Sequence, residues 1–221
     1  MEKKEIEEIK SFIKENSDYF TYEHSPTSIA RYLKIAEHID KGKILDVGCG
    51  RGIMYLSIKD KPIRYLGLEK KEKDTNLAKN ITNCEILNQD ICQNTLKKGF
   101  FDYIIISEVL EHAENPLQVL KECKFLLKDD GKIIGTVPNS ISALRIISAL
   151  SNKEYGHSDT TQIFSTIHLK NLINFAGLKL SYLETFFFQL IDGQTEDYSQ
   201  LKELFPLLGK NIFFIAEKES S

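Results

Sequence analysis

Three glycines follow a short hydrophobic segment in the stretch KILDVGCGRG, residues 43–52. They are Gly48, Gly50 and Gly52, and Asp46 precedes them. Glycine weakens regular structure, but it lets the backbone turn sharply and lets a ligand approach without a side chain intervening. The spacing therefore predicts a buried strand that ends in a ligand-binding loop.

Acidic and polar residues also end the strands expected further along the chain. Glu69 lies 23 residues after Asp46, and Asp90, Ser107 and Glu108 follow at later strand ends. Ligands of an open parallel sheet bind at the carboxyl ends of its strands. A carboxylate at Glu69 can accept hydrogen bonds from both ribose hydroxyls, and Asp90 can accept one from the adenine amine or cap the next turn. Together these residues predict a pocket for an adenosine group.

The spacing and charge of the loop discriminate among adenosine cofactors. The dinucleotide fingerprint G-x-G-x-x-G does not fit GCGRG, whose third glycine comes one residue early, and no P-loop lysine motif occurs. Asp46 is unsuited to an anionic pyrophosphate but suits a cation. S-adenosylmethionine carries a sulfonium and an ammonium group and no phosphate. We therefore expect S-adenosylmethionine as the cofactor and S-adenosylhomocysteine as the product.

Alternating strand-like and helix-like segments must position these residues. We expect strands over residues 43–48, 64–69, 85–90, 101–108 and 132–138, with helices over 52–60, 71–81 and 116–127 and a turn over 129–131. Outside this core, we expect helices over 6–13, 26–39, 141–150, 165–178 and 195–205, and closing strands over 180–191 and 211–218. The alternation predicts an α/β fold, a parallel sheet with helices on both faces.

Bulk composition excludes several classes of protein. The chain has 221 residues and a net charge of −3, without the long basic run of a nucleic-acid surface. Its four cysteines form no CxxC pair, so we expect neither a metal site nor disulfides. No apolar run approaches the roughly 20 residues of a membrane span. We expect a cytoplasmic protein without membrane insertion, either a monomer or a homodimer.

The motifs over about residues 40–140 resemble those of class I S-adenosylmethionine-dependent methyltransferases. LDVGCGRG resembles the first motif, GLE, NQD and FDYIIISEVLEH resemble the next three, and LLKDDGKIIGTVPN resembles a segment of the type 11, 12 and 23 subfamilies. The resemblance implies a seven-stranded Rossmann-like sheet in the order 3-2-1-4-5-7-6 with the last strand, residues 211–218, antiparallel. It also implies one methyltransferase domain over 1–221, with an N-terminal helical lid (1–40), a cofactor-binding core (41–140) and an acceptor-side region (141–221).

The resemblance also implies the roles of individual residues. The loop residues around the methionine part of the cofactor would be Asp46, Gly48, Cys49, Gly50 and Gly52, with Cys49 filling space. Glu69 would bind the ribose with Lys70 beside it, and Asp90 and Ile91 would hold the adenine. Ser107 and Glu108 would lie under the cofactor. Tyr22 and Arg31 belong to the lid, where Arg31 could pair with the cofactor carboxylate or remain a surface arginine.

Two histidines are candidate bases. His112 follows the fourth strand, where it could take a proton from the acceptor or only orient the loop. His157 lies in a segment that resembles the family's H-x-D-P-T-H motif, but Gln162 stands where relatives often have a histidine, which weakens a base role there.

The fourth strand ends in SEVL rather than in the (D/N)PP(Y/F) loop that grips a target base amine. We therefore expect O-methylation of a small-molecule acceptor, a metabolite or a saccharide. The alternatives are a non-catalytic partner protein that binds the cofactor and a nucleotide-dependent oxidoreductase.

Overall fold

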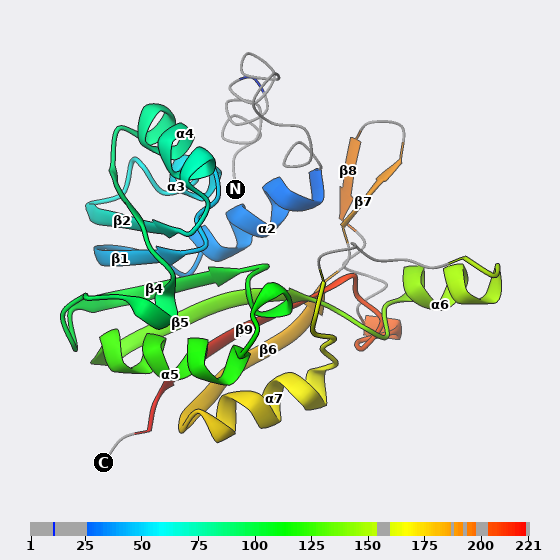
Figure 1. Cartoon of the computed structure of the whole chain (residues 1–221). Helices are drawn as coiled ribbons and strands as arrows, with labels where there is room; N and C mark the ends of the chain where they lie inside the picture. The colour runs from blue at the N-terminus through cyan, green and yellow to red at the C-terminus, as the bar shows by residue number, and fades with distance from the viewer. Residues whose placement is uncertain are drawn as a thin grey trace.

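A seven-stranded sheet forms the centre of the protein in a computed structural model, which describes residues 11, 26–153, 160–186, 188–191, 194–197 and 203–219 (Figure 1). The strands are β1 (Gly42–Val47), β2 (Ile63–Glu69), β3 (Glu85–Asn88), β4 (Phe101–Ser107), β5 (Leu127–Pro138), β6 (Leu178–Phe186) and β9 (Asn211–Lys218). Their order is β3-β2-β1-β4-β5-β9-β6. Strands β1 to β5 pair in parallel, and β9 is antiparallel to β5 and β6. The predicted order, with its last strand antiparallel, is confirmed.

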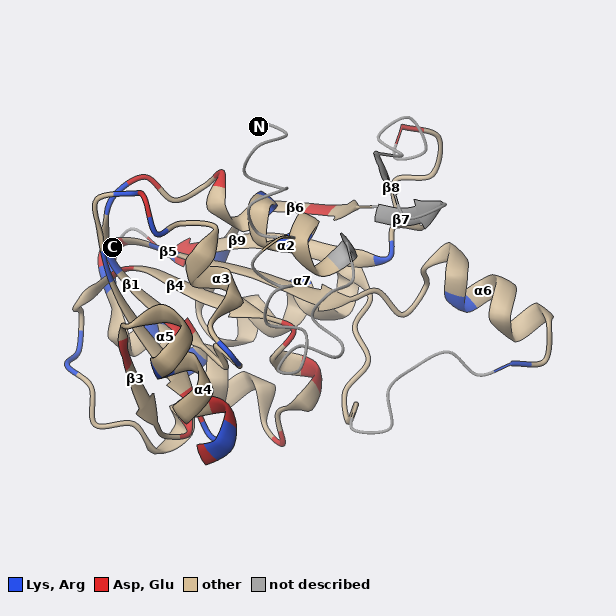
Figure 2. Cartoon of the chain, turned by 90° about the horizontal axis from the view of Figure 1, so that it is seen from above, with Lys and Arg blue, Asp and Glu red and all other residues tan. Residues whose placement is uncertain are grey.

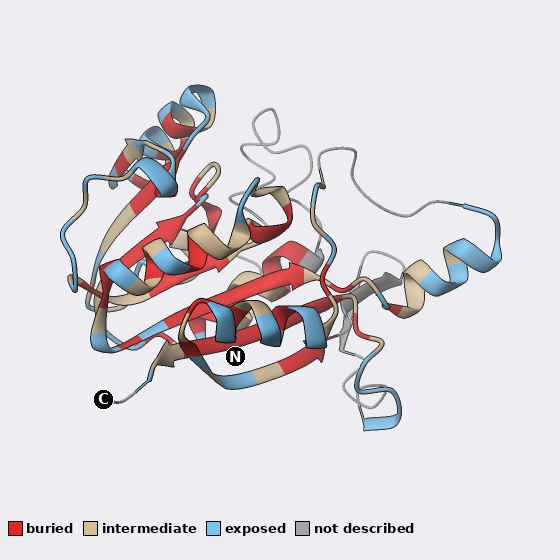
Figure 3. Ribbon diagram, turned by 60° about the horizontal axis from the view of Figure 1, so that its bottom comes forward, coloured by how far each residue is buried: buried red, intermediate tan, exposed pale blue. Residues whose placement is uncertain are grey.

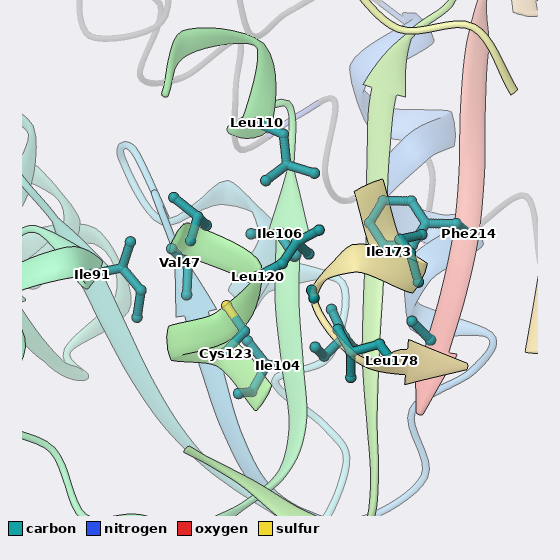
Figure 4. Close-up of a cluster of buried hydrophobic side chains, with 14 of the residues drawn as sticks. Val47, Ile91, Ile104, Ile106, Leu110, Leu120, Cys123, Ile173, Leu178 and Phe214 are labelled. Carbon is teal, nitrogen blue, oxygen red and sulfur yellow. The ribbon is translucent and has the colours of Figure 1, made fainter. Parts of the chain in front are cut away.

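Helices cover both faces of the sheet, as predicted (Figure 1). They are α2 (Pro26–Ala36), α3 (Ile53–Leu56), α4 (Glu72–Thr82), α5 (Pro116–Leu126) and α7 (Thr166–Phe175), with short 3-10 helices η1 (Ile91–Gln93) and η2 (Leu110–His112). A further helix, α6 (Ala143–Leu150), lies apart from the sheet. Successive strand residues point to opposite faces. Ile44 and Ile105 therefore pack with α2 and α3, whereas Leu45, Ile104 and Ile106 belong to the cluster that includes α5 and α7 (Figure 4).

Local sequence signals fix several helix ends. The side chain of Asn115 accepts a hydrogen bond from the backbone N–H of Gln118, and Pro116 occupies the first turn of α5. Ser165 caps α7 by accepting from the backbone N–H of His168. Gly177, with φ +71°, ends α7, because glycine adopts the left-handed conformation that stops a helix without steric strain.

Four predicted elements were wrong in part. The helix expected over 195–205 begins instead as strand β8 (Gln194–Asp197), because this segment pairs with β7 (Phe188–Ile191) in a separate antiparallel hairpin. The strand expected over 180–191 is divided between β6 and β7. The turn expected over 129–131 lies inside β5, and α3 is shorter than the predicted helix over 52–60.

Helix α6 extends away from the sheet and has no buried side chain (Figures 2 and 3). Its apolar residues Ile147 and Leu150 are 59% and 81% exposed. Arg145 is its one charged residue, whereas Lys, Arg, Asp and Glu are interspersed over the rest of the described chain (Figure 2). Within the described ranges, no helix combines the length and the hydrophobicity that a bilayer crossing requires.

Candidate cofactor and acceptor site

The glycine loop follows β1 and turns the chain into α3. Gly48, Gly50 and Gly52 all have left-handed φ angles, of +66°, +54° and +83°. A Cβ atom on Gly48 would lie 2.7 Å from Cγ2 of Val109, the residue that precedes η2. The loop conformation and this close approach both require glycine. Gly52 is buried beside Thr82 of α4, so its position is determined by helix packing.

Glu69 at the end of β2 is bonded to the glycine loop. Its side chain accepts hydrogen bonds from the backbone N–H groups of Gly50, at 3.1 Å, and Lys71, at 2.8 Å. The residue is only 8% exposed, whereas the neighbouring Lys70 is exposed. Asn88 of β3 donates to the backbone oxygen of Glu69. The carboxylate thus links the ends of β1 and β2 at the place predicted for a ribose.

Asp46 of β1 is 3% exposed and faces the sheet surface that α2 and α3 cover. The hydroxyl of Tyr65 on β2 donates to its Oδ2 at 2.6 Å. Burial raises the pKa of Asp46 to about 7, the Tyr65 hydrogen bond lowers this pKa, and the nearby Glu69 raises it. No salt bridge to Asp46 or Glu69 occurs within the described residues. Tyr65 was not among the residues predicted for the site.

Cys49 is buried between the glycines, and burial raises the pKa of its thiol. A protonated, buried thiol agrees with a space-filling residue.

Asp90 and Ile91 lie at the start of η1. Asp90 is exposed and accepts from the backbone N–H of Cys92 at 2.8 Å, so it caps this turn. Ile91 packs in the cluster with Val47 (Figure 4).

Glu108 follows β4 and has a φ angle of +57°, which is uncommon for a residue other than glycine. Its carboxylate accepts hydrogen bonds at 3.0 Å from Thr136 of β5 and Asn211 of β9. The Thr136 hydroxyl also contacts that of Ser107 at 3.0 Å. Thr136 and Asn211 were not among the residues predicted for the site. Arg31 of α2 approaches Glu108 at 3.6 Å. Glu108 was expected under the cofactor, and Arg31 was expected either to pair with the cofactor carboxylate or to remain a surface arginine.

The loop after β4 carries the candidate base. His112 is the last residue of η2, and about one third of its side chain is exposed. Its Nε2 atom lies 3.9 Å from the Glu111 carboxylate. The backbone N–H groups of Thr161 and Gln162 donate to the backbone oxygen of Glu111 at 2.8 and 3.0 Å. The acceptor-side segment is therefore anchored to the loop that holds His112. Tyr22 and His157 lie outside the described residues.

The structure thus bonds Glu69 to the glycine loop at the carboxyl ends of β1 and β2, and Asp46 of β1 lies near enough to Glu69 for their charges to interact. Glu108 and Arg31 form a second polar cluster after β4. Across the described ranges, no group of His, Cys, Asp and Glu residues is suited to hold a metal ion.

Comparisons with known proteins agree with this arrangement. A family model described as a methyltransferase domain matches residues 20–183. Two curated relatives are ubiquinone biosynthesis O-methyltransferases, from Acinetobacter baylyi (27% identical over 154 residues) and Coxiella burnetii (34% over 105). The matches cover 62% and 45% of this chain, which spans only 63% and 45% of the lengths of these relatives.

The solved structure of an S-adenosylmethionine-dependent methyltransferase from Thermotoga maritima has a similar fold. The TM-score is 0.70 at 18% identity, covering 96% of this chain and 98% of the other. The fold, the order of the motifs and the family match lead to one conclusion: the chain belongs to the class I S-adenosylmethionine-dependent methyltransferases.

Proposed function

We propose that this chain transfers a methyl group from S-adenosylmethionine to an oxygen atom of a small-molecule acceptor, a metabolite or a saccharide. The observation that carries the proposal is the pair of buried carboxylates, Asp46 and Glu69, on either side of the glycine loop. Within the described residues, neither carboxylate has a cationic partner. A ligand that combines a cation with a ribose fits these two carboxylates, because they can attract the cation and accept hydrogen bonds from the ribose hydroxyls.

The residues of the loop fit the cofactor in distinct ways. Asp46 would face the cationic methionine part, and the Glu69 oxygens, which already accept from two backbone N–H groups, retain lone pairs for ribose hydroxyls. Gly48, Gly50 and Gly52, with Cys49, would bring the backbone close to the ligand. Lys70, Asp90 and Ile91 would border the adenosine end. When bound, the cofactor supplies a methyl group on a positively charged sulfur.

The chain's contribution to the transfer would be positioning and the exclusion of water. Ser107 and Glu108 would form the floor of the site, held by the hydrogen bonds to Thr136 and Asn211. Arg31, and Tyr22 from the preceding segment, would cover the cofactor. These roles follow from the resemblance and from the places of Ser107, Glu108 and Arg31 in the fold.

An oxygen acceptor must lose a proton during or after attack. We propose His112 as the group that takes it, because it follows β4 in the loop to which the acceptor-side segment is anchored through Glu111. His157 is a second candidate. The names of the curated relatives, ubiquinone biosynthesis O-methyltransferases, support an oxygen acceptor.

The first test is calorimetric titration of the purified chain with S-adenosylmethionine and, separately, with a nicotinamide dinucleotide. We expect binding of the first ligand only. Gly50→Arg should abolish that binding without unfolding the domain. Gly99→Arg is a matched control, because Gly99 also has a left-handed φ, of +61°, but precedes β4 at the opposite end of the strands. Equal binding by both variants would place the cofactor site elsewhere.

The second test incubates the chain with a methyl-labelled cofactor and a panel of phenols, saccharides and amines. Label in an oxygen-linked methyl group, with release of S-adenosylhomocysteine, is the expected result. Binding of the cofactor without transfer to any compound of the panel would favour a non-catalytic partner protein. Transfer to nitrogen would contradict the oxygen assignment.

A further inference from the structure

Tyr65 reaches Asp46 from the neighbouring strand. The two residues lie on the same face of the sheet, because Asp46 pairs with Gly67 in the β1–β2 register and Tyr65 stands two residues before Gly67. Gly67 has no side chain, and Cys49 packs into the space where one would begin. The Tyr65 ring also contacts the ring of Tyr55, with centroids 5.1 Å apart. The hydroxyl is thus held by packing against a buried carboxylate.

Few other groups are available to stabilise a charge on Asp46. Glu69 from the end of β2 carries the same charge, and Cys49 from the loop is a buried thiol. From the glycine loop, Arg51 pairs with Asp74 at 3.1 Å, and from α2, Arg31 approaches Glu108. Tyr65 makes the only hydrogen bond to the Asp46 side chain that the described residues provide. Its phenol therefore determines the orientation of this carboxylate.

We propose that Tyr65 is a positioning residue for the cofactor: its hydroxyl orients Asp46 and favours the carboxylate form, leaving Oδ1 to meet the cationic methionine part. This inference rests on the proposed function. Tyr65 does not touch the cofactor in this role and acts through Asp46 alone.

A pH signature follows from this geometry. Asp46 titrates near neutrality because burial raises its pKa to about 7 and the Tyr65 hydrogen bond limits that rise. Only the ionised carboxylate attracts a cation, so affinity for the cofactor should increase as the pH rises through about 7. Loss of the hydroxyl moves the titration of Asp46, and with it the increase in affinity, to higher pH.

The test compares Tyr65→Phe with Tyr103→Phe. Tyr65 and Tyr103 both stand opposite Ile44, on either side of β1, but the hydroxyl of Tyr103 bonds to the backbone of Asp40. Calorimetry with S-adenosylmethionine between about pH 6 and pH 8.5 should give about a tenfold weaker Kd for Tyr65→Phe at pH 7, and a smaller difference at the upper end. Tyr103→Phe should match the wild type at every pH.

A constant ratio of Kd values at all pH values, or no change at all, would overturn the role of Tyr65. Carbon-13 titration of the Asp46 carboxyl in the ligand-free protein gives an independent readout. In Tyr65→Phe, the Asp46 carboxyl should titrate at a higher pH than in the wild type. In an Asp46→Asn background, Tyr65→Phe should leave the pH profile of binding unaltered. If the wild-type protein does not bind the cofactor, the proposed function is overturned. If the wild-type protein binds and Tyr65→Phe shows the same pH dependence of binding, only this inference is overturned.

Discussion

Arg31 on α2 lies beside Glu108 at the end of β4, with 3.6 Å between Nη1 and Oε2. Burial by itself lowers the pKa of Arg31, but the attraction of Glu108 contributes to a pKa that is raised overall. Asn211 and Thr136 hydrogen bond to the same carboxylate. One acidic side chain therefore connects the helix over the sheet to three of its central strands.

Replacement of Arg31 should test this connection. Arg31→Met should lower the free energy of unfolding by about 1–2 kcal/mol, less than for a wholly unpaired buried charge, because the bonds from Thr136 and Asn211 remain. Urea unfolding measures the effect. Arg31→Met combined with Glu108→Gln should cost less than the sum of the single variants. Additive losses would show that the two side chains are not coupled.

The ribose role of Glu69 predicts a loss of affinity on truncation. Glu69→Ala should weaken cofactor binding by about 1–3 kcal/mol, because charge-assisted hydrogen bonds to the ribose and to the loop are both lost. Glu72→Ala, at an exposed position in the first turn of α4, is the control and should bind normally. Calorimetry at constant pH measures the Kd of each variant for the cofactor. An unchanged Kd for Glu69→Ala would show that Glu69 does not bind the ribose.

Asp46 should make the stability of the ligand-free protein depend on pH. Its folded-state pKa is about 7 and its ordinary value is 3.8, so between these values the folded state holds a proton that the unfolded state has released. This contribution to the free energy of unfolding is present below about pH 4 and is lost as the pH rises through about 7. Urea unfolding from about pH 4 to pH 8 should therefore show that the free energy of unfolding of Asp46→Asn increases relative to that of the wild type as the pH rises. A constant difference would mean that Asp46 ionises normally.

Helices α6 and α7 should respond differently to loss of their apolar residues. Ile147→Ser and Leu150→Ser in α6 should change the free energy of unfolding by less than about 0.5 kcal/mol, because both side chains are exposed. Leu169→Ala in α7 should cost about 2–5 kcal/mol, because Leu169 is fully buried. Thermal or urea unfolding measures all three. A large loss from the α6 variants would mean that this helix is packed in solution.

The parts of the site that were predictable from the sequence are local. The glycine loop and the carboxylates at the strand ends follow from short motifs, and a resemblance to known motifs supplies the strand order. The helix expected over residues 141–150 corresponds to α6, but the apolar residues of a segment do not say whether another element covers them.

The contacts that the sequence did not reveal join residues far apart in the chain. Asn211 bonds to Glu108 across 103 positions, and only the insertion of β9 beside β5 brings them together. Tyr65 meets Asp46 because of the register between β1 and β2, which no property of either residue indicates alone. The hairpin of β7 and β8 likewise depends on a partner strand, and helix propensity within residues 195–205 could not reveal it.

The position of β9 has a consequence for how the chain is made. This strand lies between β5 and β6 but leaves the ribosome after both of them. Until it arrives, facing edges of β5 and β6 offer unpaired backbone groups to any other nascent chain. This half of the sheet is completed only when β9 is inserted. The hydrogen bond from the Asn211 amide to Glu108 also forms only then, because Asn211 belongs to β9.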